Sequence, residues 1–181
     1  MKKVFYYNYI PNKAEEEACK VSNTPWQVTR VLEEIRDIYP PPVIDYQNPW
    51  QIKKTLTHYE AATGKLVVSF VDAFEHVFRY WTLCMANHVV LGHKVTVIVW
   101  DVTEQNNPKR YRNDSVFFEM LPNDDYILAC MDVFKDQCLN VDDEIGVFWD
   151  PRASTFQFKL LCRGGKPGWS HVSNYDISSN Y

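Results

Sequence analysis

Short alternations of apolar and polar residues predict a mainly β chain from residue 50 onward. In the run 155–161, Phe156, Phe158 and Leu160 share one face, because side chains alternate along a strand. The apolar run 144–149 precedes it, and the turn residues 150–154 make the two runs a predicted hairpin. Seven such segments indicate a barrel or a sandwich of short strands. They are residues 50–56, 66–71, 94–102, 115–121, 125–130, 144–149 and 155–161.

Two short helices are predicted between these strands. The first begins at Asp72, which is placed to cap it, and Glu75 would complete a capping box. Its apolar side consists of Phe74, Val77, Phe78 and Trp81. The second helix is predicted from Asp132 to Gln137.

Residues 1–49 differ from the rest of the chain and predict an N-terminal extension with one helix over residues 25–39. Thr24 can cap this helix, Pro25 suits its first position, and the triplet Pro40–Pro42 ends it. Its apolar residues recur at helical spacing, and they are Val28, Val31, Leu32, Ile35 and Ile38. We expect this face to pack on the following domain; alternatively, it binds a partner protein in a groove.

Composition favours one globular domain. The chain has 181 residues, of which 46% are hydrophobic and 15% aromatic, enough for a sizeable core. It has no apolar run of membrane-spanning length and no signal peptide pattern, so we expect an intracellular protein without a membrane partner. Residues 164–181 are rich in Ser, Asn and Gly, which predicts a flexible C-terminal tail.

Motifs for catalysis or metal binding are missing from the sequence. The five cysteines form no Cys-x-x-Cys pair, and no histidine stands at zinc-finger spacing. There is no phosphate-cradling glycine-rich loop and no Gly-x-Ser-x-Gly elbow. We therefore expect a protein that is not an enzyme and needs no cofactor or metal.

Two segments resemble a known family. Residues 50–57 read Trp-Gln-Ile-Lys-Lys-Thr-Leu-Thr, and residues 142–150 read Asp-Asp-Glu-Ile-Gly-Val-Phe-Trp-Asp. Their order and spacing resemble the plant B3 DNA-binding domain, most closely its divergent subgroup, over Trp50–Arg163. The resemblance implies a seven-stranded open pseudobarrel with two short helices. It also implies sequence-specific binding of double-stranded DNA in the nucleus, in plant transcriptional regulation.

The resemblance further implies that two loops grip the major groove. In the first, at 57–65, the residues that could meet bases or sugars are Thr57, His58, Tyr59 and Thr63. The lysines that could meet phosphates are Lys65 in this loop and Lys53 and Lys54 in the strand before it. In the second, at 121–126, the matching residues are Asn123 and Tyr126. A basic cluster between the third and fourth strands could touch the DNA backbone, act as a nuclear-import signal or be a solvated loop tip; it consists of Lys109, Arg110 and Arg112.

Charge leaves an alternative open. The net charge is −4, and residues 50–163 carry 12 basic and 15 acidic residues, so duplex binding would need a local basic surface. Asp124 and Asp125 lie in the second loop, where each would repel a phosphate by about 1 kcal/mol. The alternative is a B3-like protein-interaction module with weakened or lost DNA binding.

Overall fold

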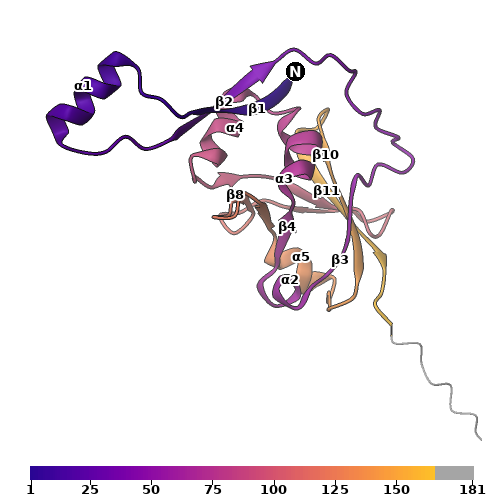
Figure 1. Cartoon of the computed structure of the whole chain (residues 1–181). Coiled ribbons are helices and arrows are strands. Elements are labelled where there is room, and N and C mark those ends of the chain that lie inside the picture. The colour runs from indigo at the N-terminus through magenta and orange to yellow at the C-terminus, as the bar shows by residue number, and fades with distance from the viewer. Residues whose placement is uncertain (166–181) are drawn as a thin grey trace, which may run out of the picture.

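The computed structural model describes residues 1–165, and within them the chain is mainly β, with three sheets that do not close into a barrel (Figure 1). Each of the seven predicted segments overlaps at least one strand. Residues 166–181, most of the predicted C-terminal tail, lie outside the described residues. Gly164, at the start of that predicted tail, donates its backbone N–H to Asp143 Oδ1 at 2.8 Å.

The larger sheet has five strands and contains the predicted hairpin. In it Trp149 pairs with Phe156 and Val147 with Phe158, so these apolar side chains share the inner face. Neighbouring strands in this sheet run antiparallel, with one exception: the strand that contains Phe156 and the strand that contains Val99 run parallel. The strand order is β3 (Ile52–Thr55), β10 (Glu144–Asp150), β11 (Thr155–Cys162), β6 (Val99–Asp101) and β7 (Lys109–Tyr111).

The second sheet has four strands, and the predicted strand 94–102 is divided between it and the larger sheet. The Val97 N–H bonds to Val116 C=O on one side, whereas Ile98 C=O accepts from the Phe156 N–H on the other. The chain therefore changes sheets between these two residues. The order in this sheet is β4 (Lys65–Val68), β9 (Tyr126–Ala129), β8 (Phe117–Met120) and β5 (Val95–Thr96).

An aromatic core joins the sheets. Phe118 stacks on Phe156 with ring centroids 5.5 Å apart, and Phe78 meets the Tyr126 ring edge-on at 4.9 Å. All four side chains are fully buried. Aromatic pairs of this kind add about 0.5–1.5 kcal/mol each beyond the burial of their area, so the core fixes how the two sheets face each other.

The helices differ in part from those predicted. The predicted cap at Asp72 is wrong: Ser69 caps α3 (Phe70–Asp72), which continues as the π-helix η1 (Ala73–Phe78). Its predicted apolar residues are all buried. The second predicted helix is α5 (Met131–Asp136), and α4 (Leu83–Val90), with Thr82 as its cap, was not predicted.

The predicted helix over residues 25–39 is wrong. Residues 29–35 form strand β2 (Thr29–Ile35), which pairs antiparallel with β1 (Lys2–Asn8), and the helix of this region is α1 (Lys13–Ser22). The β-branched residues Thr29, Val31 and Ile35 suit a strand. β1 is the pairing partner of this strand: Phe5 lies opposite Leu32, and Tyr6 lies opposite Val31.

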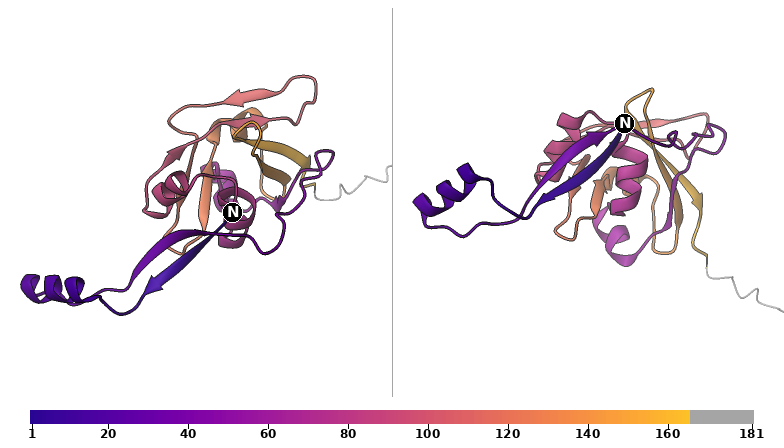
Figure 2. Two further views of the ribbon diagram at one scale, coloured as in Figure 1. Left: turned by 90° about the horizontal axis from the view of Figure 1, so that it is seen from above. Right: turned by 45° about the horizontal axis from the view of Figure 1, so that its top comes forward.

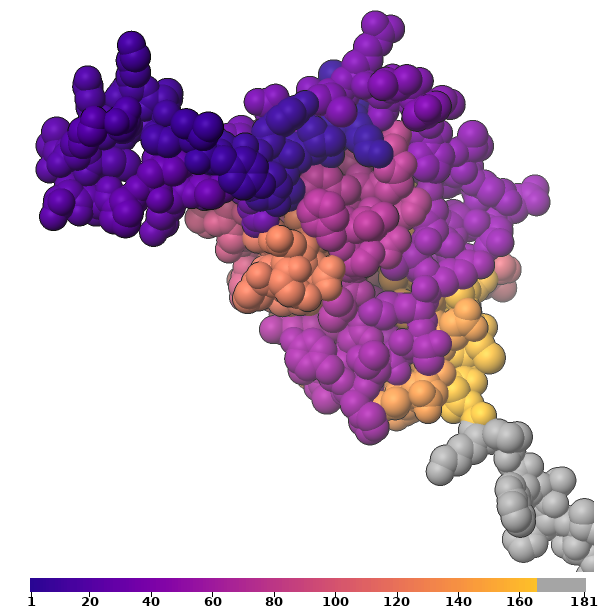
Figure 3. Space-filling model, viewed as in Figure 1, coloured from indigo at the N-terminus to yellow at the C-terminus, as the bar shows by residue number. Residues whose placement is uncertain are grey.

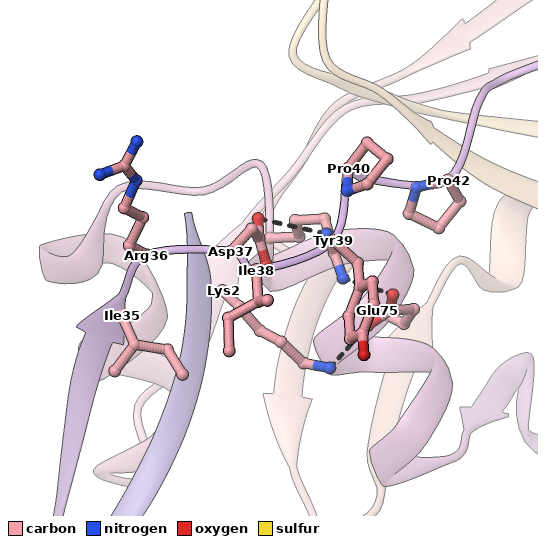
Figure 4. Close-up of a pocket in the computed structure, with 10 residues that line it drawn as sticks. Lys2, Ile35, Arg36, Asp37, Ile38, Tyr39, Pro40, Pro42 and Glu75 are labelled. Atoms are coloured by element: carbon pink, nitrogen blue, oxygen red, sulfur yellow. Dashed lines mark hydrogen bonds and ion pairs between the residues drawn. The ribbon is translucent and has the colours of Figure 1, made fainter.

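The β1–β2 hairpin packs through one face on the body of the protein, the part that contains the five-stranded and four-stranded sheets. Phe5 stacks on Phe70 and meets the Phe74 ring at a tilt, and Leu32 is 3% exposed. At its base, Arg79 pairs with Glu75 and lies 3.2 Å from Asp37, while Lys2 reaches Glu75 at 3.5 Å (Figure 4). The tip of the hairpin carries α1 away from the body (Figures 1 and 2), and no residue of α1 is buried.

Candidate nucleic-acid interface

The first predicted loop contains a short helix, α2 (His58–Thr63), held at both ends. Thr57 caps its start by accepting from the Glu60 N–H, while Glu60 accepts from the Thr57 N–H at 3.1 Å. Gly64 ends it with φ +63°, in the left-handed region that glycine adopts at low cost. The helix therefore presents His58 and Tyr59 to solvent on a fixed backbone.

A buried ion pair holds α2 against the sheet. The Glu60 carboxylate is fully buried, pairs with Lys54 and accepts from the Val67 N–H at 2.8 Å. Lys54 also donates to Val67 C=O at 2.7 Å. Burial opposes ionisation of Glu60, but the bonds from Lys54, Val67 and Thr57 outweigh it and hold the pKa of Glu60 below its ordinary value. Lys54, expected at a phosphate, is thus engaged inside the protein.

The carboxylates of the second loop have partners within the protein. Asp124 lies 2.7 Å from the Arg30 guanidinium, which comes from β2. Asp125 accepts from the Phe70 N–H at 3.0 Å and from the Asn123 side chain at 2.9 Å. The negative charge of this loop is therefore partly neutralised by the hairpin and by the start of α3.

The two loops flank one pair of strands. Lys65, the last residue of the first loop, pairs with Ala129, and Val68 pairs with Tyr126, the last residue of the second loop. The strands are antiparallel and four residues long, so their ends lie about 10 Å apart. Figure 3 shows both segments on the face turned to the viewer, the second loop in orange and α2 in purple below it.

Several residues predicted for DNA contact lie elsewhere or are engaged. Tyr126 is fully buried in the core, and burial raises the pKa of its hydroxyl group. The Thr57 hydroxyl donates to Glu60 at 2.8 Å, and the Thr63 hydroxyl donates to Tyr59 C=O at 2.7 Å. At these two loops, the exposed or half-buried side chains that keep their polar atoms available for contact are those of His58, Tyr59 and Lys65, whereas the exposed Asn123 amide donates to Asp125 at 2.9 Å.

The basic cluster, predicted to lie between two strands, falls largely on a strand of its own, β7. Lys109 and Tyr111 lie on one face of β7, where both reach Asp136, at 3.6 Å and 2.8 Å. Arg110 lies on the other face, paired with Trp100 of β6. The sequence signal for this strand was the alternation in Lys-Arg-Tyr-Arg: Tyr111 is half-buried, and Arg110 and Arg112 are exposed. Arg110 and Arg112 are therefore separated from the two loops by the sheet.

Residues 1–165 contain neither a candidate metal site nor a candidate membrane-spanning helix. No group of three or more His, Cys, Asp or Glu side chains in this part of the chain could hold a metal ion. Cys130 is fully buried, and desolvation raises the pKa of its thiol to about 12. Over the same residues, no helix is both long enough and apolar enough to span a bilayer.

The body that carries these loops is a mainly β domain built on two facing sheets. Residues 50–161 match the family model described as B3 domain-containing protein At5g26805, C-terminal domain. The match covers more than half of the chain, and the protein belongs to this family. Neither the curated proteins nor the solved structures contain a significant match.

Proposed function

We propose that the protein binds double-stranded DNA in the nucleus and acts, without catalysis, in plant transcriptional regulation. Membership of a B3 domain family carries this proposal, because the matched residues 50–161 include both sheets of the body and both loops. In the proposed complex the two sheets correspond to the open pseudobarrel of B3 domains. Residues 1–49 lie outside the match and add the docked hairpin.

The spacing of the loops supports binding in the major groove. Their strand ends lie about 10 Å apart, and the major groove of B-DNA is about 12 Å wide. His58 and Tyr59 offer a ring nitrogen and a hydroxyl group to base edges or sugars, and Asn123 offers its amide by exchanging the bond that it makes to Asp125. In this proposal α2 and the second loop enter the groove side by side.

The charges near the loops are compatible with this approach. Arg30 pairs with Asp124, which reduces the repulsion of a phosphate that the sequence predicts for this carboxylate. Asp125 is bonded to the neutral donors of Phe70 and Asn123 and keeps its charge. Lys65 has no ion-pair partner in residues 1–165 and lies beside α2, where a phosphate would gain one favourable contact. Few cations flank the loops, so we expect modest affinity.

Lys65→Glu tests this assignment. We expect it to weaken binding to a duplex by about tenfold and to lower the salt slope by about one unit, because one phosphate contact is lost and one repulsion is gained. Lys13→Glu, at an exposed position of α1, changes the net charge equally and should leave affinity within about twofold. Fluorescence anisotropy with a labelled duplex measures both variants. Equal losses in the two variants would exclude a specific role for α2 and its flank.

A protein-interaction function remains the second candidate, now on different residues. It no longer rests on a helix at 25–39, which does not form. The outward face of the hairpin exposes Tyr6 and Val31 to about half of their area, and the adjoining segments expose Ile10 and Val28. Exposed apolar residues gathered on one projecting element are typical of protein contacts.

A further inference from the structure

The outer face of the five-stranded sheet gathers aromatic, amide and basic side chains. The inner face holds the core, so residues that alternate with core residues point outward. One row across the sheet contains Phe148, Gln157, Trp100 and Arg110, each paired with the next. A neighbouring row contains Lys53, Gly146 and Lys159.

Part of this face forms a groove of about 400 Å³. Trp50 lies against β10 with its ring 5.6 Å from that of Phe148, and it fits because a Cβ at position 146 would come within 2.8 Å of it. The groove carries aromatic walls, amides and cations together. Its lining includes Tyr46, Trp50, Phe148, Gln47, Gln105, Gln157, Arg152 and Lys159.

Three of the four basic residues of this face form no ion pair within residues 1–165. Within residues 1–165, Lys53, Lys159 and Arg110 form none. Arg152 is held differently: its guanidinium lies 3.6 Å from the centre of the Tyr46 ring and 3.3 Å from Asp150. This face therefore carries three cations without an ion-pair partner in residues 1–165, and the one carboxylate of the groove lining, Asp150, is paired with Arg152, although the net charge of the whole chain is −4.

We propose that this outer groove binds single-stranded nucleic acid. One base enters the groove and stacks on its aromatic walls, while glutamine amides bond to the base edge. Lys53 and Lys159 lie on either side of Gly146, about 10 Å apart, and contact phosphates of the adjoining nucleotides. Trp100 offers a platform to the next base in the direction of Arg110.

A single strand fits this surface better than a duplex does. In a duplex the bases are paired and stacked, so their faces are unavailable to a recessed aromatic wall. Cations combined with aromatic side chains are typical of single-strand binding, in which stacking tolerates any base. This site shares none of the exposed residues of the two loops. Lys53 was predicted to meet duplex phosphates, but we assign it to this site because it lies beside Gly146 on the outer face, so the site is independent of the proposed duplex binding.

The test uses the full chain and a fluorescein-labelled oligothymidylate of about 12 nucleotides, at about 50 and 200 mM salt. We expect binding that weakens with salt. The double variant Lys53→Glu with Lys159→Glu should weaken it by at least about tenfold. The matched control is Lys13→Glu with Lys135→Glu, two exposed lysines of the helices α1 and α5, and it should change affinity by less than about twofold.

Stacking is tested separately with Trp100→Ala, which should weaken oligothymidylate binding several-fold while circular dichroism shows an unchanged fold. Three outcomes would overturn the proposal: no binding at the lower salt, equal losses in the double variant and its control, or full binding by Trp100→Ala together with equal competition by polyglutamate. The last would define a general polyanion surface. Lys65→Glu should leave oligothymidylate binding unchanged, so failure of the duplex proposal and failure of this one are distinguishable.

Discussion

Glu60→Gln should lower the free energy of unfolding by about 3 kcal/mol at neutral pH, because it removes the charge that compensates Lys54 and leaves a buried amide group facing an N–H donor. The Glu60 carboxylate accepts from Thr57 and Val67 and pairs with Lys54, and its side chain is 1% exposed. Urea unfolding followed by tryptophan fluorescence measures the loss.

Glu15→Gln is the matched control, since Glu15 occupies the same capping-box position in the exposed helix α1. It should cost less than about 0.5 kcal/mol. The pKa of Glu60 is lowered in the folded protein, so its contribution is fully present above about pH 4.5, the ordinary value, and is lost as pH falls through the lowered value. The difference between wild type and Glu60→Gln should therefore shrink in acid; a constant difference would contradict the buried ion pair.

Gly64→Ala should lower the free energy of unfolding by about 3 kcal/mol, through a left-handed backbone and a steric conflict. Gly64 has φ +63°, and a Cβ there would lie 2.6 Å from the Met131 Cα, so the backbone of α5 or of α2 must move. Thermal unfolding by circular dichroism, analysed alongside urea unfolding, measures this cost.

Gly92→Ala separates the two causes. Gly92 also has a positive φ, +87°, but a Cβ there would meet nothing within 4 Å. It should therefore cost about 1 kcal/mol, the conformational part alone. Equal costs at the two glycines would mean that α2 does not pack against α5 as closely as described.

The strands could be predicted where a local pattern and a local turn agree. The hairpin 144–161 has both, and its register follows from the alternation of Phe156 and Phe158. The segment 29–35 shows why the rest could not be predicted. Its apolar residues fit a helical period, and only the distant β1 decides for a strand, because pairing Phe5 with Leu32 lets one face bury against the body.

The order and spacing of the segments 50–57 and 142–150 predicted where the two loops lie. The roles of the residues near these loops depend on the register of the sheet, which the sequence pattern does not show. Lys53 and Lys54 are neighbours in sequence, yet Lys54 faces inward with Ile145 to meet Glu60, and Lys53 faces outward beside Gly146. The partial neutralisation of the second loop depends on Arg30, which is 94 residues away from Asp124. No local pattern could reveal either pairing.

The most direct test of the central claim is fluorescence anisotropy of the full chain with a randomised duplex pool at about 50 and 200 mM salt. The account predicts binding at the lower salt that weakens strongly at the higher salt, is reduced by Lys65→Glu and is unchanged by Lys53→Glu with Lys159→Glu. Absence of duplex binding at the lower salt, in a protein whose fold is intact by circular dichroism, would contradict DNA binding through α2 and the second loop.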